Sequence, residues 1–136
     1  FLKIKNFEIF SFKDKIDRNF KIYNMLGKYF ACSIDFYLQP ILSWSKEMCD
    51  EELKLYEYSK KFFKKAASNY EIKYTKENHE FLNNLFKNIS SKYDINYYDL
   101  NYLFKNQITK KDWVFVDSTH CNDFGYEQIS NFIKSN

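Results

Sequence analysis

Glycine and proline are almost absent from this chain. Its 136 residues include 2 Gly and 1 Pro, where average usage would give about 10 and 7. A Gly-x-Gly-x-x-Gly dinucleotide turn, a P-loop and a Gly-x-Ser-x-Gly nucleophile elbow all need glycines close together, and Gly27 and Gly125 are far apart. Tight hairpins draw on the same two residue types. We therefore expect long elements rather than an all-β fold.

Size and composition predict a single folded domain over residues 1–136. Apolar residues make up 45% of the chain and charged residues 29%, which is typical of globular proteins. No apolar run reaches the ~20 residues that a membrane span needs, so we expect no membrane span. The net charge is only +3, and Arg18 is the only arginine. Because arginine carries most base readout, we expect no nucleic-acid partner.

The cysteines and the first residues bear on compartment and processing. Cys32, Cys49 and Cys121 are odd in number and lack C-x-x-C spacing, which argues against a disulfide framework and a zinc knuckle. Residues 1–10 lack the apolar core of a secretory signal. This slightly favours the cytoplasm without fixing the compartment. Since the chain begins at Phe1 rather than Met, we expect a processed protein or a piece of a longer one.

Helical and strand-like patterns alternate along the chain. Apolar residues recur at three- and four-residue steps in four segments, which predicts helices over 17–30, 50–69, 75–90 and 123–133. The expected N-caps of the last three helices are Asp50, Thr75 and Asp123. Short aromatic runs predict strands over 34–38 and 95–100, whereas residues 1–16 show no clear period. The alternation predicts an α/β domain with a mostly parallel sheet, incomplete because two strands alone are not stable.

The run from Phe115 to Tyr126 carries the most chemistry. A short apolar stretch, Trp113–Val116, leads to Asp117, and His120 follows three residues later, just before the last predicted helix. At this spacing the Asp117 carboxylate can reach Nδ1 of the imidazole and fix its tautomer. The imidazolium formed when Nε2 takes a proton would then be stabilised. In α/β folds such groups lie beyond the carboxyl ends of strands.

Three other interpretations of these residues stay open. Asp117 could simply cap a turn, with His120 an ordinary surface residue. A cysteine hydrolase could pair Cys32 or Cys49 with His120, although Cys32 reads as core, and Cys121 reads as a packing residue. A zinc site could be formed by the residues Asp117, His120, Cys121 and Asp123, although these ligands are crowded and His79, the only other histidine, lies in a predicted helix.

Two sequence segments resemble the SGNH (GDSL-type) hydrolases. The last conserved block of that family is Asp-x-x-His, four residues and then Gly before a helix, and Asp117, His120 and Gly125 match this spacing. The segment Phe36–Pro40 is similar to the Leu-Gln-Pro end of a sheet strand in many members. Lys46, followed by Glu51 and Glu52, also resembles what comes next there. The resemblance extends from about residue 20 to the end.

The resemblance implies a serine ester hydrolase with a three-layer α/β fold and a flavodoxin-like, mostly parallel sheet. It gives His120 the role of general base and Asp117 the role of orienting residue. The oxyanion would be held by the Ser amide, a Gly amide and an Asn side chain. The usual substrates are esters, often acyl groups on carbohydrates, and no cofactor or metal is involved.

One part of the family pattern is missing. The Gly-Asp-Ser motif with the nucleophile, the Gly block and the Gly-x-Asn-Asp block are all absent, and Ser118 lies between Asp117 and His120 where it cannot face the imidazole. We therefore expect this chain to be the C-terminal part of such a domain, inactive alone. A missing N-terminal half or a partner chain would supply the serine. The alternative is a non-catalytic domain of degenerate hydrolase fold that binds a glycan or a protein partner.

Overall fold

The computed structural model describes residues 6–65 and 73–136, with side chains from residue 12 onward. The structure is mainly helical, with 65% helix and 8% strand, and its one sheet has two parallel strands. The expected three-layer, flavodoxin-like α/β fold is therefore wrong. The order of elements suggested layers around a sheet, but within the described residues only two four-residue segments pair as strands. None of the described helices is both long and apolar enough to cross a membrane.

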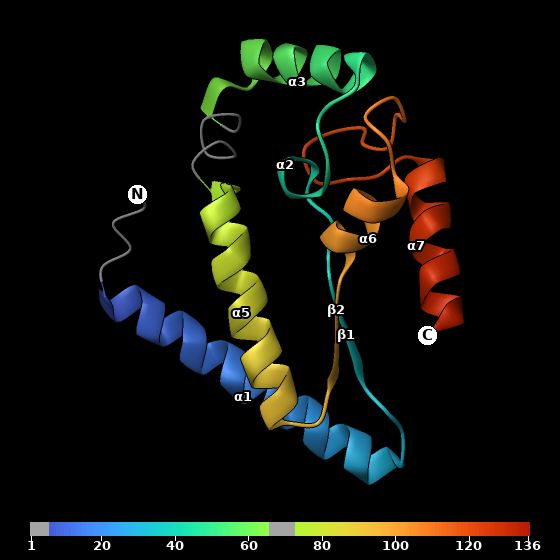
Figure 1. Ribbon diagram of the computed structural model, residues 1–136. Helices are drawn as coiled ribbons and strands as arrows, with labels where there is room; N and C mark the ends of the chain where they lie inside the picture. Colours follow the sequence, from blue (N-terminus) through green and yellow to red (C-terminus); the bar gives the residue numbers. More distant parts are fainter. Residues whose placement is uncertain (1–5, 66–72) are drawn as a thin grey trace. The chain divides into compact units, whose positions relative to one another are not determined.

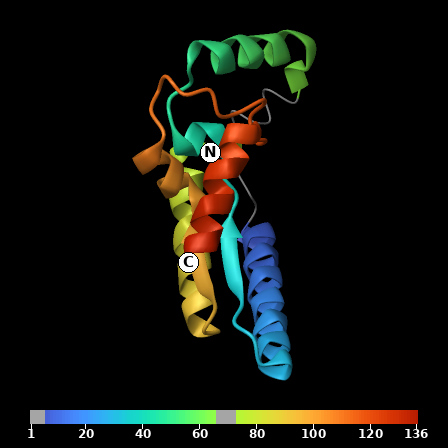
Figure 2. The same cartoon turned by 90° about the vertical axis from the view of Figure 1, so that its right-hand side faces the viewer.

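The chain divides into two compact units. The first combines residues up to Leu38 with Glu77–Tyr98, and the second combines Gln39–Lys76 with Asp99–Asn136. The elements of the first are α1 (Asn6–Phe30), β1 (Asp35–Leu38), α5 (Lys76–Lys92) and β2 (Asn96–Asp99). Figures 1 and 2 show the two strands side by side. The register of β1 and β2 is set where the two strands begin, because the amide of Asn96 donates to the carbonyl of Ile34.

Aromatic rings form the core of the first unit. Phe20 of α1 is 1% exposed, and its ring centroid lies 4.9 Å from that of Phe36 on β1. Phe86 of α5 lies 4.9 Å from the same Phe36 ring. Both helices therefore pack on the face of the sheet that carries Phe36. On the other face, Tyr37 and Tyr98 stack at 5.0 Å.

Both long helices of this unit end with a residue in the left-handed conformation. Ala31 has φ 51°, and the amide of Cys32 donates back to the carbonyl of Gly27. Asp94 has φ 54°, and the amide of Ile95 donates to the carbonyl of Ser90. This is the Schellman ending, which usually uses glycine at that position. The glycine-poor chain makes the same turns with alanine and aspartate.

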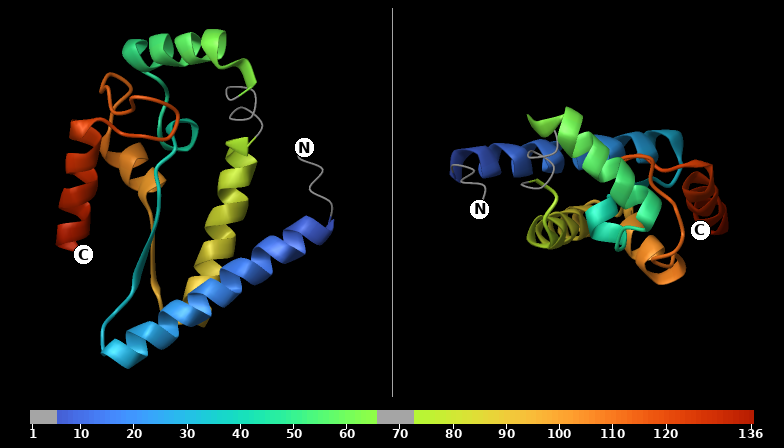
Figure 3. Two further views of the ribbon diagram at one scale, coloured as in Figure 1. Left: turned by 180° about the vertical axis from the view of Figure 1, so that it is seen from behind. Right: turned by 90° about the horizontal axis from the view of Figure 1, so that it is seen from above.

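The second unit contains helices and a long loop that leads into its last helix (Figure 3). In the described residues its helices are α2 (Leu42–Ser45), α3 (Asp50–Phe62), α6 (Leu100–Gln107) and α7 (Asp123–Ser135). The side chain of Asn101, which is fully buried on α6, joins α6 to the segment before α2. Its Oδ1 accepts from the Ile41 amide at 2.7 Å and from the Ser45 hydroxyl at 2.9 Å, and its Nδ2 donates to the Gln39 carbonyl.

The four predicted helices and two predicted strands are present with shifted bounds. α1 begins at Asn6 rather than Asp17, because residues 6–16 contain no glycine or proline to stop the helix. α3 ends at Phe62, well before the predicted end at residue 69, and residues 66–69 lie outside the described residues. The run Trp113–Val116 forms no strand and contributes only an isolated bridge.

Two of the predicted caps are wrong by one residue. Cys49, not Asp50, is the N-cap of α3, because the Glu52 side chain reaches back to accept its amide. Asn122, not Asp123, caps α7, and its Oδ1 accepts from the Gly125 amide at 3.0 Å.

Candidate functional site

The residues singled out in the sequence lie on a loop that is closed at its base. Phe115 and Cys121 form an antiparallel bridge. The amide of Val116 donates to the carbonyl of His120 at 2.9 Å, and the amide of Asn122 donates to the carbonyl of Val114 at 2.7 Å. Residues 116–120 are thus held as a short loop between two paired positions. Asn122 ends the loop and caps α7.

Asp117 and His120 are hydrogen-bonded to each other in this loop. Oδ2 of Asp117 lies 2.7 Å from Nδ1 of His120. Oδ1 accepts from the amides of Thr119 at 2.7 Å and His120 at 2.8 Å. The carboxylate therefore has one oxygen for the backbone turn and the other for the ring. This is the arrangement that the Asp-x-x-His spacing predicted.

The electrostatics of Asp117 define the tautomer of His120. Partial burial raises the pKa of the Asp117 carboxyl, but hydrogen bonds from the Thr119 amide and from the His120 ring and amide outweigh this, and the net pKa is lowered. An ionised carboxylate can only accept hydrogen bonds. Nδ1 must therefore be the donor, which leaves the lone pair of a neutral ring on Nε2. The structure shows no partner for Nε2 among the described residues, and the His120 side chain is 64% exposed.

A buried ion pair lies behind the loop. The side chains of Lys46 and Glu52 are 3% and 0% exposed, and Nζ lies 2.8 Å from Oε2. Oε1 of Glu52 accepts from the amides of Val114 at 2.9 Å and Phe115 at 3.0 Å, just before the loop. Burial raises the Glu52 pKa, but Lys46 and the three backbone amides reverse this, and the net pKa is lowered. Glu52 is therefore a fixed negative charge with every oxygen in use.

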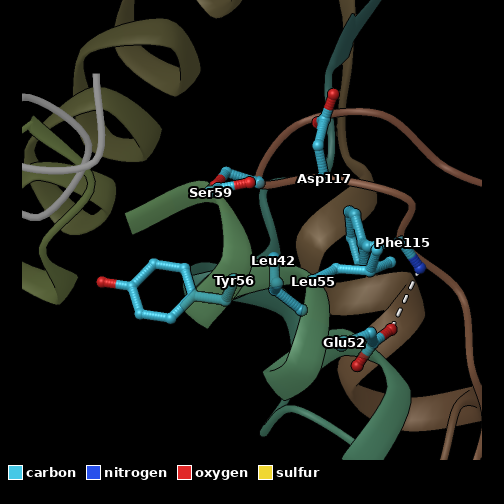
Figure 4. Close-up of a pocket in the computed structure, with 8 residues that line it drawn as sticks. Leu42, Glu52, Leu55, Tyr56, Ser59, Phe115 and Asp117 are labelled. Atoms are coloured by element: carbon cyan, nitrogen blue, oxygen red, sulfur yellow. Dashed lines mark hydrogen bonds between the residues drawn. The ribbon is translucent and has the colours of Figure 1, made fainter. Parts of the chain in front are cut away.

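A shallow pocket adjoins Asp117 (Figure 4). It contains about 230 Å³ of empty space, part of it open to solvent. Its apolar wall is formed by Leu42, Leu55, Tyr56 and Phe115, and Ser59 of α3 lines it together with Asp117. Sequence reasoning gave no role to Ser59. Neither Ser59 nor Ser118, which also lines the pocket, has a hydrogen bond to the His120 ring in the described part of the chain.

The structure bears on the cysteine-hydrolase and zinc-site interpretations of these residues. Burial raises the pKa of Cys121 to about 12, and the charges of Asp117 and Glu52 add to this, so its thiol stays protonated. Cys49 is buried and its pKa is also raised by burial, whereas Cys32, expected in the core, is exposed. For a metal, no three His, Cys, Asp or Glu side chains gather suitably within residues 6–65 and 73–136.

Several residues noticed only for their sequence likeness have positions around the loop. Nε2 of Gln39 donates to the carbonyl of Thr119, and the amide of Leu42 donates to the carbonyl of Ser118 at 3.2 Å. Lys46 and Glu52 anchor the residues before the loop. Nothing in the sequence assigned them this role, because each bond joins positions about 60 to 80 residues apart. The capping role of Asn122 had a local signal, since Asn is among the preferred N-cap residues.

Comparison with known proteins gives no family for this chain. No protein-family model matches it, and a search of curated proteins finds no match.

Proposed function

We propose that Asp117 and His120 are the orienting residue and the general base of a serine ester hydrolase. The observation that carries the proposal is the 2.7 Å contact between Oδ2 of Asp117 and Nδ1 of His120, with the Nε2 side of the ring exposed. The resemblance of the Asp-x-x-His block to the SGNH hydrolases supports the same reaction class. The three-layer fold of that family is not part of this proposal.

The pair would act by moving one proton. Nε2 of His120 takes the proton of a serine hydroxyl as the serine oxygen attacks the ester carbonyl carbon. Asp117 stabilises the imidazolium that forms and keeps its ring in place. The proton then passes from Nε2 to the leaving alcohol, and an acyl-serine remains. Water, activated by the same nitrogen, releases the acid and restores the serine.

Because the chain lacks the Gly-Asp-Ser motif of the family, the serine in this proposal comes from a further segment of the natural protein or from a partner chain. In the described part of the chain no serine hydroxyl is bonded to the His120 ring. The substrate class is a small-molecule or carbohydrate ester, since the motif resembles that family.

The test is ester hydrolysis by the protein as its organism makes it. With p-nitrophenyl acetate as substrate, His120→Ala and Asp117→Asn should each lower kcat/KM by about 10²–10⁴-fold, the range for a lost general base or its orienting carboxylate. Asp123→Asn changes a neighbouring exposed carboxylate in α7, and it should leave turnover unchanged. Ser59→Ala and Ser118→Ala should do the same.

Each outcome bears directly on the proposal. Turnover that His120→Ala does not affect would remove the pair from the reaction. A wild-type protein without hydrolytic activity would also overturn the proposal and leave the non-catalytic binding domain in its place. Turnover lost in Ser59→Ala but not in Ser118→Ala would contradict the external serine and place the nucleophile in α3.

A further inference from the structure

We propose that the buried Lys46–Glu52 pair is a positioning device for the Asp117–His120 hydrogen bond. Its catalytic meaning rests on the proposed function, but its structural content does not. No other role for this pair follows from the hydrolase chemistry, because neither side chain is accessible: Lys46 is 3% exposed and Glu52 is 0% exposed.

Two buried backbone amides just before the loop donate to Glu52. Val114 and Phe115 are 0% and 1% exposed. The bridge that closes the loop uses the carbonyl of Val114 and the amide of Val116. It provides no backbone acceptor for the amides of Val114 and Phe115. Oε1 of Glu52 accepts both. Without this oxygen two buried donors would have no acceptor in the structure, which is a costly state.

The Lys46–Glu52 pair also contacts the chain further upstream, at Asp112. Nζ of Lys46 donates to Oε2 of Glu52 and to the carbonyl of Asp112. The pair is therefore hydrogen-bonded to residues 112, 114 and 115, and Asp117 follows two residues after Phe115. On the far side of the loop, Gln39 and the amide of Leu42 hold the carbonyls of Thr119 and Ser118. Residues 39–52 thus form hydrogen bonds to the chain on both sides of Asp117.

The geometry of the Asp117–His120 hydrogen bond depends on the backbone that carries it. The Asp117–His120 pair is half-exposed, with side chains 48% and 64% exposed, so packing contributes little to its geometry. An exposed charged pair contributes little energy of its own. The geometry of this hydrogen bond therefore depends on how firmly the loop backbone is held, and the buried carboxylate of Glu52 holds the residues just before the loop.

The decisive experiment compares two double variants of the protein as its organism makes it. Changing Glu52 alone would leave the Lys46 cation buried and unpaired, which can prevent folding. Lys46→Met with Glu52→Gln removes both charges but keeps an oxygen for the amides of Val114 and Phe115. Lys46→Met with Glu52→Leu also removes both charges and keeps a similar volume, but it removes the acceptor. Replacing a buried pair by apolar residues is often tolerated, so the Lys46→Met/Glu52→Gln variant should fold. The Lys46→Met/Glu52→Leu variant leaves the buried amides of Cys49, Val114 and Phe115 without their acceptor, so its folding is measured before its tautomer is read.

The measurement is the tautomer of His120, read from ring ¹H–¹⁵N correlations with the imidazole neutral. In the wild type the proton should be on Nδ1. In the Lys46→Met/Glu52→Leu (Met/Leu) variant the ratio of the Nδ1–H to the Nε2–H form should fall about tenfold. This is the change in an equilibrium expected when a hydrogen bond to a charged group is lost. In the Met/Gln variant it should stay within about twofold of the wild type. Unchanged far-UV circular dichroism and unchanged Asn101 amide resonances would show that the fold is kept.

A wild-type ratio in the folded Met/Leu variant would overturn the proposal. If that variant does not fold, hydrogen exchange of the wild type decides. The amides of Val114 and Phe115, held by Glu52, and those of Thr119 and His120, held by Asp117, should then lose protection with the same dependence on urea. Earlier loss at Thr119 and His120 alone would show a loop that opens independently of Glu52. No readout needs a substrate, so failure of the hydrolysis assay would leave this result intact.

Discussion

The two oxygens of Asp117 serve two purposes at once. Oδ1 accepts two amides of its own turn, and Oδ2 accepts from the His120 ring. Capping a turn and orienting a histidine are therefore not exclusive alternatives in this loop. The turn fixes the carboxylate, and the fixed carboxylate then selects one ring nitrogen.

The three thiols should differ sharply in reactivity at pH 8. Cys32 is exposed, whereas Cys49 and Cys121 are buried. A pKa of about 12 in place of 9.0 lowers the thiolate fraction of Cys121 about 10³-fold, and the thiolate is the reactive form. In the native protein, a disulfide reagent such as DTNB should therefore label the exposed Cys32 first and the buried Cys121 much more slowly.

The control for this measurement is Cys32→Ser, which should abolish the fast phase. Rapid labelling of Cys121 in the native protein would contradict the assignment of its thiol as a packing group. It would also restore a cysteine beside His120 as a candidate nucleophile.

At the scale of elements, Gly125 sets how closely α7 approaches the loop. A Cβ at this position would lie 2.7 Å from Cγ1 of Val114 and 2.8 Å from Cβ of Cys121. Gly125→Ala should therefore lower the free energy of unfolding by about 1–2 kcal/mol, because overpacking outweighs the better helix propensity of alanine. Urea unfolding followed by tryptophan fluorescence measures this difference.

The matched control is Asn131→Ala, at an exposed position of the same helix. It should change the free energy of unfolding by less than about 0.5 kcal/mol. If Gly125→Ala were as stable as this control, the close approach of α7 to Val114 and Cys121 would be wrong.

How well an element could be predicted depended on its length and on how local its signals are. α5 and α7 were predicted within two residues at either end, because their apolar period continues over several turns. α2 was missed because its four residues, Leu42–Ser45, are too few to show a period. α6 was missed although Leu100, Leu103 and Phe104 are spaced for a helix and are all buried. Here the strand pattern just before it masked the start.

At the scale of the whole molecule, the contact between Asp117 and His120 was easier to predict than the fold. The Asp117–His120 contact spans three residues, so sequence spacing is nearly a distance. The sheet depends on pairing between β1 and β2, which lie about 60 residues apart, and nothing local reports how many strands will join. The same limit applies to Glu52, whose bonds to Val114 and Phe115 cross more than 60 residues.

The two units should respond differently to acid. In the described residues five carboxyl groups have a lowered pKa, and the four that lie in the second unit are Glu47, Glu52, Asp112 and Asp117. The fifth, Asp17, lies in the first unit. Because each binds its proton more weakly when folded, unfolding takes up protons. The stability they contribute is complete above their ordinary pKa values of 3.8 and 4.5 and is lost as pH falls through the lower folded values.

An acid titration with two probes tests this difference. Both tryptophans, Trp44 and Trp113, belong to the second unit, so their fluorescence reports that unit alone. Far-UV circular dichroism also includes α1 and α5 of the first unit. As pH falls below about 4.5, fluorescence should change first, while much of the helical signal remains. Asp17→Asn should leave the fluorescence transition where it is. Superimposed transitions for the two probes would mean that the chain unfolds as one cooperative body, and the uneven distribution of shifted carboxyls would then have no separate effect.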